Sequence, residues 1–170
     1  MKKLLCIIIT LFMLIPLSGC FINDYYRYLS INLETLTTYF KQSQSDFQNA
    51  ADVFNSISEL HMITKNKSWL KTRKDLIIKE YGSLIIISTK SLSEEQYNEI
   101  FNRVAPLFNE KKLEAISWFN KKLEFVYTSV VSGSNGWIYT PDGVEPDKEK
   151  NYIAEMERIN ENWYSCIWAS

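Results

Sequence analysis

The sequence predicts an α+β protein in which helices come first and a mostly antiparallel sheet, formed by the C-terminal half, follows. Three observations predict this order. Apolar residues recur at alternating spacings of three and four over residues 29–61, as on one face of a helix. Ser93 opens a second helical pattern with a capping box. From Leu113 onward the apolar period falls towards two, which is typical of strands.

The pattern over residues 29–61 predicts one long helix. Its face combines two series with a period of seven: Leu29, Leu36, Ser43, Ala50 and Ile57, and Leu33, Phe40, Phe47, Phe54 and His61. Rings and small residues suit packing within the chain better than an intermolecular coiled coil. The helix would be about 50 Å long in a domain roughly 40 Å across. A kink at residues 42–46, where Ser45 and Gln48 match a capping box, is the alternative to an unbroken helix.

Residues 69–81 allow two interpretations. As a helix they place their apolar residues on one face, and Gly82 follows as the C′ residue. As a strand they begin at the β-rich Leu76–Ile78. We predict the helix, followed by a buried strand at Leu84–Thr89, which is a short apolar run rich in isoleucine.

Ser93 marks the start of the next helix. Gln96 completes its capping box, and acidic residues fill the first turn. The apolar face that follows consists of Tyr97, Ile100, Phe101, Val104, Leu107 and Phe108. Pro106 lies too deep for a first turn and should kink the helix or end it nearby.

The rest of the chain predicts short strands and turns. The strands are expected at Leu113–Phe119, Leu123–Val131, Trp137–Tyr139 and Trp163–Trp168. Residues 132–136 are rich in turn formers and predict a loop. Thr140-Pro141-Asp142-Gly143 predicts a turn with proline at its second position. Residues 147–159 are polar and have some helical character.

The first residues have the parts of an export signal. Lys2 and Lys3 form a positively charged start, and Leu4–Pro16 is an apolar run. This run is shorter than the roughly 20 residues that cross a bilayer as a helix. Small residues, Ser18 and Gly19, follow it, as a cleavage site requires.

The end of this leader, Leu17-Ser18-Gly19-Cys20, closely resembles the lipobox of bacterial lipoproteins. The resemblance implies that residues 1–19 are removed and that Cys20 is acylated. Two or more acyl chains hold a protein stably on a membrane, at about 0.8 kcal/mol per buried methylene. Phe21, in place of an aspartate, implies the outer membrane in a diderm host; in a monoderm host it would be the cell membrane. An ordinary signal peptide with an incidental cysteine is the alternative.

Removal of residues 1–19 leaves a mature chain of 151 residues. We predict that it consists of a short membrane-proximal segment, 20–28, and a single domain, 29–170. Such a chain buries about 70% of its unfolded surface. The leader holds two of the 19 lysines and arginines and none of the 20 acids, so the mature net charge is −3. That balance argues against nucleic-acid binding.

A basic cluster is the candidate surface contact. It consists of Lys65, Lys67, Lys71, Arg73, Lys74 and Lys79. Near a membrane such residues attract anionic headgroups at about 1 kcal/mol each, and a solvated helix face is the simpler interpretation. The acidic residues Asp142, Glu145, Asp147 and Glu149 lack the spacing and glycine of an EF-hand loop, so no calcium site is predicted.

No catalytic or metal-binding set is expected. His61 is the only histidine, on a helical face far from Cys166, so neither a Cys–His pair nor zinc is predicted. Cys166 alternates with Tyr164 and Trp168, which predicts a buried thiol. Four of the five tryptophans, Trp118, Trp137, Trp163 and Trp168, lie in or beside predicted strands. If these tryptophans were exposed, they could stack on the sugar rings of glycans. A packed sheet is also rich in aromatic residues, so their presence does not distinguish the two interpretations.

The sequence therefore predicts a lipid-anchored, non-enzymatic protein of the cell envelope that binds another protein, with an inhibitor or immunity protein as one version. It needs no cofactor. The alternatives are a binder of cell-wall glycan or a small ligand through the aromatic C-terminal sheet, and an envelope hydrolase. No spacing selects the paired carboxylates that a hydrolase would need.

Overall fold

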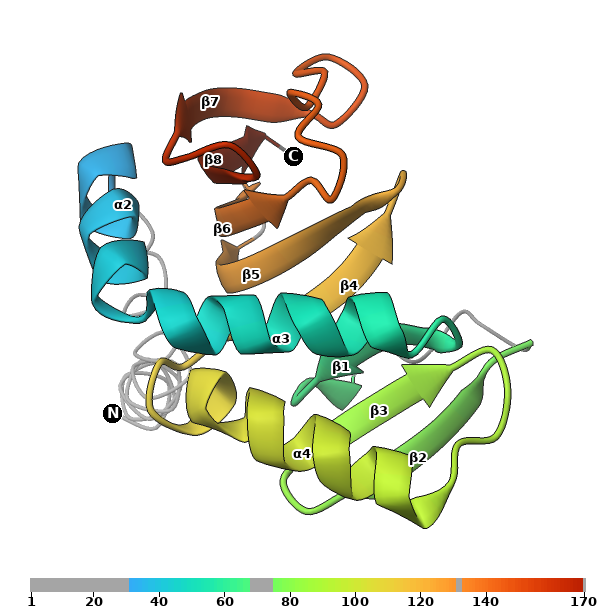
Figure 1. Ribbon diagram of the computed structural model, residues 1–170. Coiled ribbons are helices and arrows are strands. Elements are labelled where there is room, and N and C mark those ends of the chain that lie inside the picture. The colour runs from blue at the N-terminus through green and yellow to red at the C-terminus, as the bar shows by residue number, and fades with distance from the viewer. Residues whose placement is uncertain (1–30, 68–74, 131–132, 170) are drawn as a thin grey trace, which may run out of the picture.

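The computed structural model describes residues 31–67, 75–130 and 133–169. Within these ranges, three helices and one eight-stranded antiparallel sheet confirm the α+β class (Figure 1). The strand order is β2-β3-β1-β4-β5-β6-β8-β7. The strands are β1 Leu60–Thr64, β2 Ile77–Tyr81, β3 Leu84–Ser88, β4 Ala115–Phe119, β5 Lys122–Val130, β6 Gly133–Tyr139, β7 Ile153–Arg158 and β8 Trp163–Ala169.

The sequence predicted that the sheet is formed by the C-terminal half of the chain. The observed sheet also contains strands from earlier in the chain. Strands β1 to β3 precede the last helix, and β1 pairs with both β3 and β4. Ile63 on β1 lies opposite Ile86 on one side and Ile116 on the other. The central pairing of β1 with β4 therefore joins the two halves into one sheet.

The prediction of one long helix over residues 29–61 is wrong. Its described part forms two helices, α2 Leu33–Gln42 and α3 Gln44–Ser56, and then strand β1, which contains His61. The break falls at the buried Ser43, with φ −135°, rather than at a cap on Ser45. The bend lets both helices reach one ring, because Trp163 lies 4.8 Å from Phe40 and 5.8 Å from Phe47 between ring centroids.

The predicted helix at residues 69–81 is also wrong where the structure describes it; residues 69–74 lie outside the described ranges. Ile77–Tyr81 is strand β2, which forms a hairpin with β3. The turn places Gly82 at φ +58°, as the first central position of a type II′ turn requires. A Cβ there would lie 2.5 Å from the Phe101 ring, so only glycine lets the hairpin pack this closely on the last helix.

The last helix, α4 Glu94–Asn109, starts as predicted. Gln96 donates its backbone N–H to Ser93 Oγ at 3.2 Å, and its side chain accepts from the Ser93 N–H at 2.8 Å. The helix ends three residues after Pro106, in agreement with the expected stop.

The C-terminal strands are confirmed at β4, β5 and β8, whereas two segments differ from prediction. The predicted loop at residues 132–136 is strand β6 from Gly133 onward. Gly136 is needed because a Cβ there would overlap the carbonyl oxygen of Phe125, next to a bulge in β5. The predicted helical character at residues 147–159 is wrong, because Ile153–Arg158 forms strand β7. The turn at Thr140–Gly143 is confirmed by a 3.1 Å backbone hydrogen bond.

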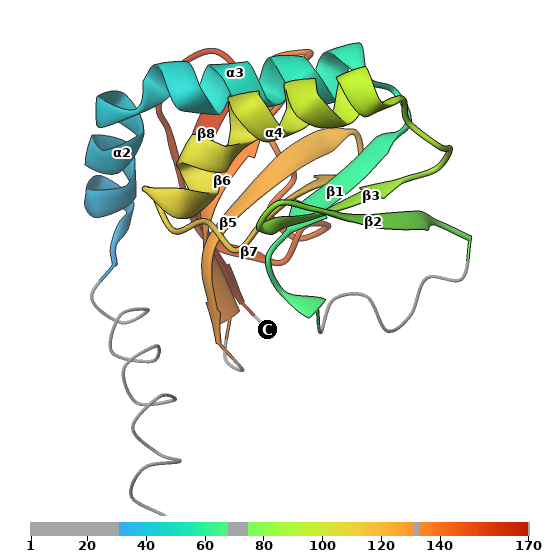
Figure 2. The same cartoon turned by 90° about the horizontal axis from the view of Figure 1, so that it is seen from below.

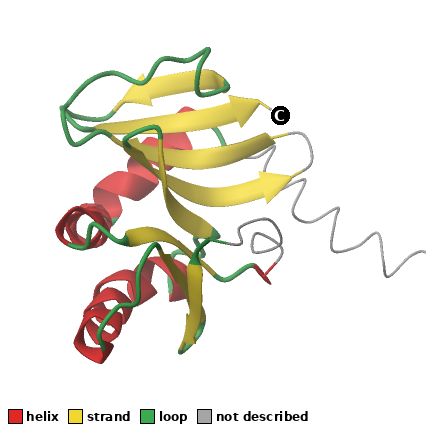
Figure 3. Ribbon diagram, turned by 90° about the vertical axis from the view of Figure 1, so that its right-hand side faces the viewer, coloured by secondary structure: helices red, strands yellow, loops and turns green. Residues whose placement is uncertain are grey.

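The sheet has one face under the helices and a second face opposite (Figures 2 and 3). The helix-facing core holds most of the large rings, including Phe47, Phe125 and Trp137. On the second face, β6, β7 and β8 form a smaller cluster: Ile138, Ile153, Tyr164, Cys166 and Trp168. Cys166 is fully buried there, which confirms the prediction for this thiol.

Candidate functional site

The basic cluster that the sequence singled out is only partly described. Lys71, Arg73 and Lys74 lie outside the described ranges, as does Cys20. Each of the other three lysines contacts a different partner. Lys65 Nζ donates to the Phe108 carbonyl at 2.7 Å, Lys67 Nζ pairs with Glu80 at 2.6 Å, and Lys79 Nζ pairs with Glu94 at 2.9 Å. A shared basic contact surface therefore remains a prediction.

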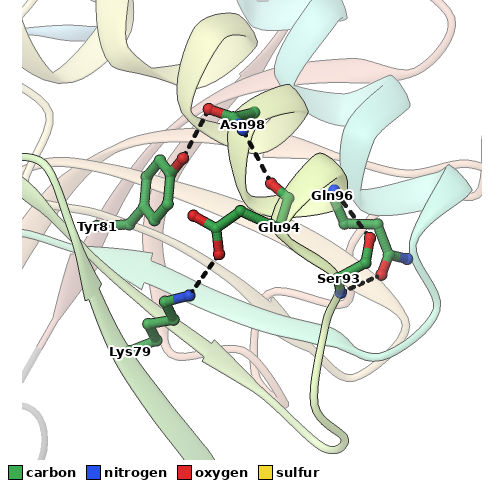
Figure 4. A network of polar contacts seen from close by, with 6 residues as sticks. All are labelled: Lys79, Tyr81, Ser93, Glu94, Gln96 and Asn98. Carbon is green, nitrogen blue, oxygen red and sulfur yellow. Dashed lines mark hydrogen bonds and ion pairs between the residues drawn. The ribbon is translucent and has the colours of Figure 1, made fainter.

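Lys79 belongs to a polar network between β2 and the start of α4 (Figure 4). Its ammonium group lies 4.1 Å from the centre of the Tyr97 ring, and Tyr81 donates to Asn98 Oδ1 at 2.6 Å. The hydrogen bond with Lys79 lowers the pKa of Glu94, and the same contact raises the pKa of Lys79. These exposed contacts fasten the hairpin to the helix, which is a structural role.

A pocket on the second face of the sheet is the better candidate. Its volume is about 450 Å³. We call it the second-face pocket, and it is lined by Phe119, Glu124, Val126, Ser134, Asn151, Tyr152, Trp168 and Ala169. These residues come from the ends of β4 and β8, from β5 and β6, and from the turn before β7, so five separate segments build the site.

Glu124 is the one ionisable carboxyl among the residues that line this pocket. Leu123 and Phe125, its neighbours on β5, enter the helix-facing core, so strand alternation points Glu124 to the second face. Burial raises the pKa of its carboxyl to about 7, although the positive charge of Lys122 acts in the opposite direction. Within the described ranges no hydrogen bond or ion pair holds this carboxyl.

Two polar atoms of buried side chains that line the pocket also lack partners among the described residues. Asn151 is 4% exposed; its amide nitrogen donates to the Asp147 carbonyl, and its Oδ1 accepts nothing. Trp168 is 7% exposed, and its indole N–H has no acceptor. A buried polar group without a partner costs about 1–3 kcal/mol. Both atoms are closed off from solvent, so they belong to the interior of the pocket wall and are not open contacts for a ligand.

Cys166, on the same face, does not supply a nucleophile. Burial raises the pKa of its thiol, and the nearby charge of Glu124 raises it further. Thiolate is the reactive form of cysteine. Because the thiol stays protonated and has no exposed surface, it is a core residue of β8.

The tryptophans divide between the two faces. Trp137 and Trp163 are buried under the helices, where their indole N–H groups donate to the Leu36 carbonyl at 3.1 Å and to Gln48 Oε1 at 3.3 Å. Trp118 packs against the same core and is half-buried. Trp168 alone among these four lines the second-face pocket.

The described residues give little support for other chemistry. No three His, Cys, Asp or Glu side chains in these ranges gather closely enough to hold a metal ion. None of the described helices has the length and apolar character that crossing a membrane requires. No protein-family model, curated protein or solved structure matches the chain. Its function must therefore be inferred from its own residues.

Sequence reasoning missed every polar member of the second-face pocket. The alternation around Glu124 assigns it to the face opposite Leu123 and Phe125, which in a sheet with one covered face is exposed to water. The local signal was weak: one acid between apolar neighbours in a strand. Ser134 lies in a segment predicted as a loop, and Asn151 lies in a segment predicted as polar with some helical character.

Proposed function

We propose that this protein binds a small ligand in the second-face pocket while it is anchored to an envelope membrane through Cys20. The observation that carries the proposal is one cavity whose lining combines the Glu124 carboxyl, with its raised pKa, and the aromatic residues Phe119, Tyr152 and Trp168. Ligand sites typically combine apolar and aromatic walls with a few polar groups and a carboxyl of perturbed pKa, so this combination supports a ligand site.

Binding without catalysis agrees best with the groups present. The pocket lining contains one carboxyl, whereas glycoside hydrolysis uses two. A nucleophile also needs a base within hydrogen-bond reach, and the hydroxyl of Ser134 has no histidine or second carboxyl in the lining. Of the alternatives raised by the sequence, the small-ligand binder is thus favoured over the hydrolase.

The lipobox supports a location at the membrane surface. Ten residues, 21–30, separate Cys20 from the described domain. Fully extended, they would span at most about 36 Å. An acylated Cys20 would therefore keep the pocket near the bilayer and restrict its ligands to those at the envelope surface.

A pocket-filling variant tests the binding proposal. Ser134 is a half-buried residue of the lining, and Ser134→Phe would place a ring in the cavity. We expect fragments that bind the full chain in ligand-observed NMR to lose binding to this variant. Ser58→Phe, an exposed site between α3 and β1, is the matched control. The proposal fails if no fragment binds the wild-type chain, or if the filled variant binds the same fragments equally well.

A second function, binding of a partner protein, is favoured by the edge strand β2. In the described part of the chain β2 pairs only with β3, and its residues Ile77 and Ile78 are 40% and 41% exposed. Exposed apolar edge strands accept additional strands from partner proteins. This edge supports the protein-interaction hypothesis that the sequence suggested.

A further inference from the structure

We infer that the second-face pocket takes a small organic ammonium ion, whose charged nitrogen pairs with the Glu124 carboxylate. This inference rests on the proposed ligand-binding function and names the chemical class of the ligand. It follows from the charge and the aromatic rings of the pocket lining.

Charge is the first argument. Glu124 is the only acidic or basic side chain in the lining, and within the described ranges it has no ion-pair partner. Glu124 is half-buried, so its carboxylate loses part of its hydration without gaining an ion-pair partner, and pairing with a cation offsets that cost. An anionic ligand would meet repulsion at the same place.

The walls of the pocket suit a cation with an apolar body. Phe119, Tyr152 and Trp168 contribute aromatic rings, whose faces attract ammonium groups. Ser134 adds a half-buried hydroxyl to the same lining. The ligand thus described carries an amino group attached to an apolar body.

Binding of this kind is linked to a proton on Glu124. The residues that share the second face with Glu124 come from each neighbouring element. They are Ser117 on β4, Lys122 on β5, Ile138 on β6, Cys166 on β8, and Asn151 and Tyr152 in the turn before β7. Of these, Lys122 lowers the pKa of Glu124, and burial raises it to about 7. Because an ammonium ion needs the ionised carboxylate, binding should weaken about tenfold from pH 8 to pH 6.

Three matched probes test the ligand class: benzylamine, benzyl alcohol and benzoate, which are cationic, neutral and anionic. The full chain in lipid nanodiscs is titrated by calorimetry at pH 8, and empty nanodiscs are subtracted. We expect binding of benzylamine, weakened roughly tenfold or more by Glu124→Gln, because a charge-assisted pair is lost. Glu155→Gln, at an exposed site on β7, makes the same change outside the pocket and should leave binding unaltered.

Each other outcome counts against the ammonium class. If benzyl alcohol or benzoate binds as tightly as benzylamine, if Glu124→Gln changes nothing, or if pH 6 does not weaken binding, the inference is overturned. If none of the three probes binds, but other fragments bind the wild-type chain and lose binding to Ser134→Phe, the ammonium class is wrong and the proposed ligand-binding function of the pocket stands. If the probes bind Ser134→Phe as well as wild type, both the class and the pocket function fail.

Discussion

Glu124 lies in an environment that disfavours the ionised form of its carboxyl. A carboxyl ordinarily titrates near 4.5, and burial on the second face of the sheet raises the pKa of this one to about 7. Its neighbours Leu123 and Phe125 stabilise the core under the helices, so β5 cannot rotate to release the carboxyl without exposing them. The strand therefore keeps an unfavourable side chain where a ligand can reach it.

Glu124→Gln should make the protein more stable at alkaline pH. Since the folded-state pKa is above the unfolded value, wild type carries no penalty well below pH 4.5. The penalty grows between pH 4.5 and 7 and then levels at about 3 kcal/mol. Glutamine cannot ionise, so the variant should gain up to that amount at pH 8 and a few tenths of a kcal/mol at pH 4.5.

Urea denaturation at the two pH values measures this difference, with Glu155→Gln as the control at an exposed site. An equal change in the free energy of unfolding at both pH values would contradict the raised pKa. A variant less stable than wild type at pH 8 would do so as well.

The two edge strands of the sheet differ in the kind of side chain that they expose to solvent. Strand β7 exposes charged side chains, Glu155, Glu157 and Arg158, which discourage pairing with other chains. Strand β2 exposes Ile77 and Ile78, and Ile78 lies opposite Ile87, a member of an apolar cluster on the second face that also includes Met62. Within the described ranges, β2 is thus the edge suited to a partner.

Ile78→Lys should abolish capture of a partner at this edge. With a photocrosslinking residue at position 77 in intact cells, we expect a defined protein adduct in the otherwise wild-type chain and its loss in the lysine variant. Ile78 is 41% exposed, so the free energy of unfolding should change by less than about 1 kcal/mol. Ala154→Lys on β7 is the control. An adduct that survives Ile78→Lys, or the lack of any adduct in the otherwise wild-type chain, would contradict apolar strand addition at this edge.

At the scale of the whole molecule, the two faces of the sheet differ in how completely they are covered. Helices α2, α3 and α4 close one face over the aromatic core, and that layer accounts for most of the buried apolar surface. The second face is covered only in part, by side chains of β6 to β8 and the turn before β7, and the pocket lies there. Stability and the proposed binding are thereby assigned to opposite faces of one sheet.

Cys20→Ala should release the protein from the membrane. Because the lipid is expected on this thiol, the variant should lose labelling by a fatty-acid probe and should remain unprocessed or appear in the soluble fraction. Cys6→Ala, within the leader, is the control and should keep both labelling and processing. Persistent labelling of the Cys20→Ala chain would show that the lipobox assignment is wrong.

The sequence by itself determined the features that depend on neighbouring residues. The capping box of Ser93 and Gln96 needs only one helical turn, and the structure contains both of its hydrogen bonds. The alternation of Tyr164, Cys166 and Trp168 placed one side of β8 correctly in the interior, because strand geometry repeats every two residues. The turn at Thr140–Gly143 is local in the same way.

Tertiary structure decided the features that depend on distant partners. Residues 33–56 are helical on local grounds, but the bend at Ser43 exists because Phe40 and Phe47 both contact Trp163, more than a hundred residues away. Ile77–Tyr81 is a strand because β3 pairs with it. The second-face pocket joins five segments of the chain, and burial raises the pKa of Glu124 only once they meet. No local pattern encodes that assembly, since strand pairing and burial are set by the whole sheet.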